Sequence, residues 1–148
     1  MTEKTIKLCG KDVPILYCAA TETGYERLSG KNIEVFLPTF GKDDDGNVII
    51  SEPPKATTED YLQLSIAAIV AANEAERLAK NMKPDEFPLP ITSEDLLYQA
   101  AKAEVTSLIT AVIELRNEWY GVSTVVKEPT PQEEEDRPKN MKAPTSGT

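Results

Sequence analysis

The sequence predicts an α+β fold, in which N-terminal β-hairpins and a short helix pack on two longer C-terminal helices. Two observations predict it. The N-terminal part alternates apolar and polar residues around turn-forming glycines, as half-buried strands do. Residues 58–80 begin with an almost continuously apolar run from Tyr61 to Ala72, which is typical of a helix covered from several sides. We therefore expect a central helix in a single domain at 1–126, followed by a disordered, acidic, proline-rich tail at 127–148.

Composition limits the function classes. The chain has 148 residues, 40% of them hydrophobic, which suffices for one modest domain with its own core. Its net charge is −9, so it has no basic footprint for nucleic acid, and its apolar run is about half the ~20 residues that a membrane span needs. The N-terminus has no signal-peptide pattern, and we expect a cytoplasmic protein that binds neither nucleic acid nor membrane. Two cysteines and no histidine predict neither a disulfide framework nor a zinc site.

The first predicted element is a β-hairpin. Alternating apolar residues in Thr5–Leu8 and in Val13–Tyr17 flank a turn at Gly10–Asp12. Pro14 has no N–H to donate, which favours an edge strand. Cys9 and Cys18 would lie at opposite ends of the second strand, too far apart to bridge, and we interpret both as small, partly buried side chains.

A short helix and a second hairpin are expected next. Residues 19–29 read as a helix that buries Tyr25 and Leu28 and ends at Gly30. Beyond it, residues 34–39 are expected to pair with residues 48–51.

The turn between these strands invites a calcium interpretation. Asp43, Asp45 and Asn47 are spaced like the first half of an EF-hand loop. The glycine, however, falls one place before the third ligand, and Pro54 occupies the position of the bidentate glutamate. A solvated hairpin tip without metal is therefore favoured.

The C-terminal half of the domain predicts a connector and one long helix. Three prolines in residues 82–90 exclude regular structure there. A helix capped by Thr92 or Ser93 should then continue to Gly121. Its apolar face would comprise Leu97, Ala101, Val105, Leu108, Val112, Leu115 and Trp119.

The opposite face of this helix is the candidate partner-binding site. It is polar but nearly uncharged, and it comprises Gln99, Thr106, Ser107, Thr110 and Asn117. A solvated face is the simpler interpretation. The alternative is a contact surface, because interface centres are depleted of charge.

Catalytic patterns are missing from the sequence. It has no histidine, no glycine-rich phosphate loop and no serine in a nucleophile elbow. We therefore expect a protein that is not an enzyme and that needs no cofactor.

Four segments carry a resemblance to a known family: Thr-Ile-Lys-Leu-Cys-Gly-Lys-Asp-Val-Pro-Ile-Leu at 5–16, Glu-Arg-Leu-Ser-Gly-Lys-Asn-Ile at 26–33, Leu-Ser-Ile-Ala-Ala-Ile-Val-Ala-Ala at 64–72 and Thr-Ser-Glu-Asp-Leu-Leu at 92–97. In this order they resemble the tail assembly chaperones of long-tailed, siphovirus-like bacteriophages and prophages. The resemblance covers roughly residues 4–121 as an order of elements.

The resemblance implies a chaperone in the bacterial host cytoplasm. Such a protein binds the tape-measure protein of the phage tail, keeps it soluble and promotes assembly of the tail-tube protein around it. Self-association into a homo-oligomer stays open. Two other classes remain as alternatives: a phage structural or head–tail joining protein, and a small inhibitor or adaptor of a host protein.

Overall fold

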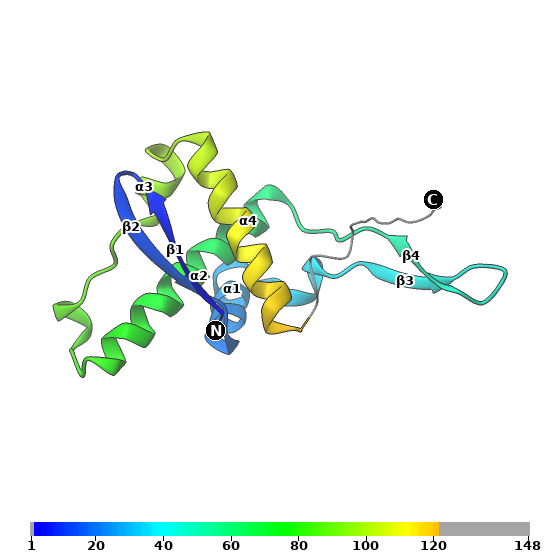
Figure 1. The fold of residues 1–148 in the computed structure, drawn as a ribbon, viewed down its shortest axis with the longest axis horizontal. Coiled ribbons are helices and arrows are strands. Elements are labelled where there is room, and N and C mark those ends of the chain that lie inside the picture. The colour runs from blue at the N-terminus through cyan, green and yellow to red at the C-terminus, as the bar shows by residue number, and fades with distance from the viewer. Residues whose placement is uncertain (1, 122–148) are drawn as a thin grey trace, which may run out of the picture. The chain divides into compact units, whose positions relative to one another are not determined.

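The computed structural model describes residues 2–121, and their fold is α+β, as predicted (Figure 1). In this range, two antiparallel hairpins and four α-helices follow one another, with two 3-10 turns between them. They are β1 (Glu3–Leu8), β2 (Lys11–Leu16), α1 (Ala19–Ser29), η1 (Ile33–Phe36), β3 (Thr39–Lys42), β4 (Val48–Glu52), α2 (Thr58–Ala79), η2 (Pro84–Glu86), α3 (Ser93–Tyr98) and α4 (Lys102–Trp119).

The chain divides into a compact unit at Met1–Leu115 and a second unit that begins at Arg116. Only residues 116–121 of the second unit are described. The expected domain end at 126 and the expected tail at 127–148 lie outside the described residues and stay predictions.

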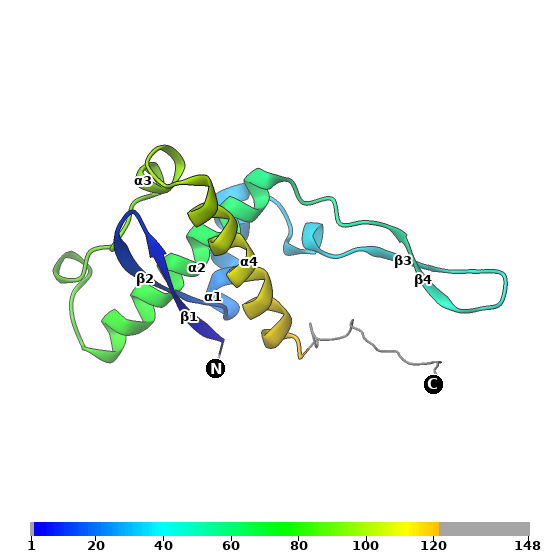
Figure 2. The same cartoon turned by 45° about the horizontal axis from the view of Figure 1, so that its top comes forward.

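Helix α2 is central to the first unit, as its apolar run predicts. Thr57 caps it: the Thr57 hydroxyl accepts the Asp60 N–H at 3.2 Å, while the Asp60 carboxylate accepts the Thr57 N–H at 2.8 Å. Leu64, Ala68 and Ile69 are buried. Both views show α2 beside the β1–β2 hairpin and α1 (Figures 1 and 2).

The β1–β2 hairpin is confirmed and supplies much of the core. Its turn lies at Cys9 and Gly10, whose φ angles of 51° and 77° fit a two-residue type I′ turn, one residue earlier than predicted. Leu8, Val13 and Ile15 are fully buried. The thiols of Cys9 and Cys18 are free, and both residues are half-buried.

Helix α1 is confirmed, together with its end at Gly30. Gly30 adopts a φ of 72° and donates its N–H to the Glu26 carbonyl at 2.9 Å. Tyr25 is buried as predicted, but Leu28 is 54% exposed, so its predicted burial is wrong. The Phe36 ring packs against Tyr25 instead, with ring centroids 5.0 Å apart.

The second hairpin is shorter than predicted and starts later. Residues 33–36 form the turn η1 and not a strand, because the Asn32 side chain accepts the Glu34 N–H at 2.8 Å and begins a 3-10 turn. That turn buries Phe36. The pairing therefore starts at Thr39, which lies opposite Glu52. Phe40 lies opposite Ile50, and a bulge separates these two pairs.

The single long helix expected after Thr92 is also a wrong prediction, because the chain breaks between α3 and α4. The Asp95 carbonyl accepts both the Gln99 and the Ala100 N–H, which ends α3. The Glu104 carboxylate then accepts the Ala101 N–H at 3.0 Å and begins α4. The same carboxylate oxygen accepts the Cys9 N–H at 3.3 Å, which ties the break to the first hairpin.

The break shifts the predicted apolar face. Leu97 is 52% exposed and Ala101 is exposed, whereas Leu96 and Ala111 are buried. Trp119 belongs to the second unit. The other predicted positions are buried to different extents. Val105 is half-buried, and Leu108, Val112 and Leu115 are fully or nearly fully buried.

The connector at 82–90 contains one regular turn that the prolines did not predict. Pro84 starts η2, and the Glu86 carboxylate accepts the Lys83 N–H at 2.8 Å. The Asn73 amide, buried on α2, donates to the Phe87 carbonyl at 3.2 Å and fastens the connector to the core. None of the helices in residues 2–121 combines the length and apolarity that a bilayer-spanning helix needs.

Candidate binding surfaces

The most buried acidic side chain of the described residues is that of Asp60, and its role is structural. Its side chain is 1% exposed and accepts hydrogen bonds from Tyr25 at 2.9 Å and from Lys31 at 3.0 Å, besides those from Thr57. Burial raises the pKa of this carboxyl, but the hydrogen bonds from Thr57, Lys31 and Tyr25 outweigh burial and lower the pKa to about 2. Asp60 thus stays ionised. It joins α2 to α1 through Tyr25 and to the loop after α1 through Lys31.

Asp43 is likewise committed to its own loop. Its carboxylate accepts the N–H groups of Asp45 at 3.0 Å and Asn47 at 2.9 Å. These hydrogen bonds lower the pKa of the exposed Asp43 carboxyl, and the bond from the Asn47 backbone N–H has the largest effect. Within residues 2–121 no cluster of three or more histidine, cysteine or acidic side chains is arranged for a metal ion.

The predicted partner-binding face divides between different parts of the molecule. Thr106, Ser107 and Thr110 are exposed on α4. Gln99, however, ends α3 and does not continue that helical face, because of the break at 99–101. Asn117 is half-buried and lies in the second unit. The part that remains on α4 has no large apolar side chain to anchor a partner.

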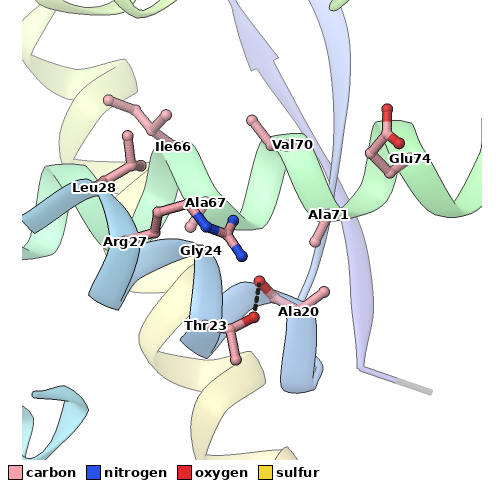
Figure 3. A pocket seen from close by; sticks show the side chains of 10 residues that line it. All are labelled: Ala20, Thr23, Gly24, Arg27, Leu28, Ile66, Ala67, Val70, Ala71 and Glu74. Carbon is pink, nitrogen blue, oxygen red and sulfur yellow. Dashed lines mark hydrogen bonds between the residues drawn. The ribbon is translucent and has the colours of Figure 1, made fainter. Parts of the chain in front are cut away.

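A groove between α1 and α2 provides such apolar side chains (Figure 3). Its volume is about 340 Å³. The two helices approach closely at Gly24, where an added Cβ would lie 3.4 Å from the Ala67 Cβ. Small residues line the groove. Helix α1 contributes the exposed Ala20 and, four residues later, the half-buried Gly24, while α2 contributes the buried Ala67 and Ala71 at the same spacing.

Larger apolar side chains border the groove. Leu28 is 54% and Val70 38% exposed, and Ile66 is half-buried beside them. Arg27 extends from α1 among these residues, and no ion-pair partner for it occurs within 2–121. Glu74, on the other helix, pairs with Arg77 at 2.8 Å.

The sequence contained a signal for this groove. Paired small residues, four apart on two helices, allow close packing and leave space above them. Gly24 interrupts the pattern of a helix, so on sequence alone it argues only against helix formation.

A second apolar surface lies on the β3–β4 hairpin. Phe40, Val48 and Ile50 are 63%, 68% and 60% exposed. Phe40 is directly opposite Ile50 and Lys42 is opposite Val48, so these four side chains share one face. We call them the hairpin face. Every residue of β3 and β4 except Gly41 is exposed, and both views show the hairpin standing apart from α1 and α2 (Figures 1 and 2).

Comparison with protein-family models, with curated proteins and with solved structures gives no match to this chain.

Proposed function

We propose that this protein is a phage tail assembly chaperone that binds helical segments of the tape-measure protein in the α1–α2 groove. The binding keeps the tape-measure protein soluble and promotes assembly of the tail-tube protein around it, in the bacterial cytoplasm and without catalysis. The observation that carries the proposal is the open groove, with exposed Leu28 and Val70 on its borders. The sequence resemblance supplies the identity of the client.

The groove suits an amphipathic helix. Peptide helices bind such grooves through apolar side chains spaced three or four residues apart. The groove is large enough for one or two such side chains, and their burial would also remove Leu28 and Val70 from water. Arg27 is positioned to pair with an acidic residue of the client.

Co-expression with the cognate tape-measure protein tests this proposal. The wild-type protein should keep the client in the soluble fraction. Val70→Asp should lower the soluble yield roughly tenfold or more, because a charge in the groove loses the desolvated apolar contact. Leu78→Asp is the matched control on the same helix: Leu78 is 66% exposed and outside the groove, so its replacement should leave the yield unchanged.

Ala20→Glu provides a second groove variant, because Ala20 is exposed and its replacement should not disturb folding. Circular dichroism confirms that each variant is folded. A wild-type protein that fails to hold the client in solution would contradict the chaperone function. Retention of the protein in purified virions would favour the structural or head–tail joining alternative.

The α4 face predicted from the sequence can be separated from the groove with another matched pair. Thr110→Lys places a charge on that face, and Lys102→Glu changes a charge on the same helix. If the groove is the client site, both variants should fold and retain full client solubility. Loss of soluble client with Thr110→Lys alone would move the contact to α4.

A further inference from the structure

The hairpin face has no cover within the unit that carries it. A two-stranded hairpin in water is only marginally stable when it stands alone. Here it exposes Phe40, Val48 and Ile50 on one face, next to the acidic loop at Asp43–Asp45. Such an apolar face, bordered by charges, is typical of a surface that binds another protein.

The α1–α2 groove of the same chain has complementary properties. It is concave and its volume of about 340 Å³ can take large side chains, while Phe40 and Ile50 project side by side from the hairpin. Charges also match, because Arg27 in the groove is opposite in sign to Asp44 and Asp45 of the acidic loop.

We propose that the β3–β4 hairpin of one molecule inserts Phe40 and Ile50 into the α1–α2 groove of a second copy of this chain. The occupant is a second copy because every molecule carries both surfaces, and because no part of residues 2–121 covers either of them. Two different patches meet in this contact, so the interface is heterologous. Repetition of such a contact produces rings or open chains and not a closed dimer.

The proposed self-association depends only on the hairpin face and the α1–α2 groove. It does not require the tape-measure protein as the client. Where both proposals hold, the hairpin of a second copy and the client helix compete for one groove. Self-association would then protect the apolar groove until the client arrives.

Sedimentation of the full chain across a concentration series tests the proposal. The wild-type average mass should rise with concentration past that of a dimer. Phe40→Asp and Val70→Asp should each raise the dissociation constant of self-association roughly tenfold or more. Each variant should therefore remain monomeric at concentrations where the wild type associates. Leu78→Asp, whose exposed side chain lies on α2 outside the groove, should associate like the wild type.

A mixture of the two variants makes the test specific. Phe40→Asp retains an intact groove and Val70→Asp retains an intact hairpin, so an equimolar mixture should form a dimer and nothing larger. Ile50→Asp and Ala20→Glu repeat the experiment on the two surfaces if either first variant fails to fold.

Three outcomes would overturn the proposal: a wild-type protein that stays monomeric, a mixture of folded variants that stays monomeric, or self-association that requires the hairpin and not the groove. The last result would mean that two hairpins pair with each other. Phe40→Asp also separates the two proposals, because it should abolish self-association and still keep the tape-measure protein soluble. Failure of the wild type to hold the client would leave the mixing result unaffected.

Discussion

The two hairpins have similar sequences and opposite environments. Both contain strand-forming apolar residues, which are Ile6, Val13 and Ile15 in the first hairpin and Phe40, Val48, Ile49 and Ile50 in the second. In β1–β2, Leu8 and Ile15 are fully buried in the same core cluster as residues of α2, whereas Phe40 and Ile50 of β3–β4 are about 60% exposed. The difference shows that strand-forming apolar residues predict a face suited to being covered, whereas the covering element depends on how the rest of the chain packs.

The connections explain why one hairpin is covered and the other is not. Strand β2 runs almost directly into α1, so the first hairpin is held where α1 and α2 pack. The second hairpin is flanked by η1 and by Pro53-Pro54, and the Lys55 N–H bonds the Val35 carbonyl at 3.1 Å at its base. This base does not bring a helix against the hairpin face.

The sharpest test of this comparison is one substitution made in both hairpins. Ile15→Asp should lower the free energy of unfolding by about 4 kcal/mol or more, because it forces an unpaired charge into the core. Ile50→Asp should change it by less than about 0.5 kcal/mol, since the side chain is already exposed. Urea unfolding of dilute, monomeric protein measures both. Similar losses would show that the second hairpin is packed in solution.

The fold could be predicted wherever local chemistry decides it. The caps at Thr57 and Thr92 and the end of α1 at Gly30 follow from short-range hydrogen bonds that the sequence specifies. The break at 99–101 could not be predicted in this way, because the Glu104 carboxylate that begins α4 also binds the Cys9 N–H from a distant turn. The predicted burial of Leu28 was wrong for a similar reason. The ring that packs against Tyr25 is that of Phe36, which belongs to another element, η1.

The candidate surfaces were harder to predict than the fold. Charge depletion indicated the α4 face, but it says nothing about shape, and the helix break removes Gln99 from that face. The groove arises only when the small residues of α1 meet those of α2. A single helix pattern does not show which of its faces will meet another helix.

Asp60 predicts the next largest effect and its dependence on pH. Its pKa is lowered from 3.8 to about 2 in the folded protein, so its ionised form stabilises the fold. That stabilisation, about 2 kcal/mol, is fully present above pH ~4 and is lost as the pH falls towards ~2. Asp60→Asn should lower stability at pH 7 and flatten this acid dependence, as measured by urea unfolding at several pH values.

Asp43 is the matched control in the exposed hairpin. The pKa of its carboxyl is also lowered, but its partners lie in its own loop. Asp43→Asn should therefore leave the acid dependence of global unfolding as it is in the wild type. If the Asp43 variant flattened it as strongly as Asp60→Asn, the second hairpin would have to unfold together with the core.

The smallest effect, and the finest comparison, comes from the glycines of the two hairpin turns. Gly10 and Gly46 have φ angles of 77° and 83°, and an added Cβ at either would meet nothing within 4 Å. Alanine at each position thus costs conformational energy alone, about 1 kcal/mol. Gly10→Ala should lower global stability by that amount, because β1–β2 and the core unfold as one. Gly46→Ala should leave global stability unchanged and speed hydrogen exchange at the β3–β4 amides roughly fivefold, because that hairpin opens locally. If Gly46→Ala instead lowered global stability as much as Gly10→Ala, the contrast between the two hairpins would be wrong.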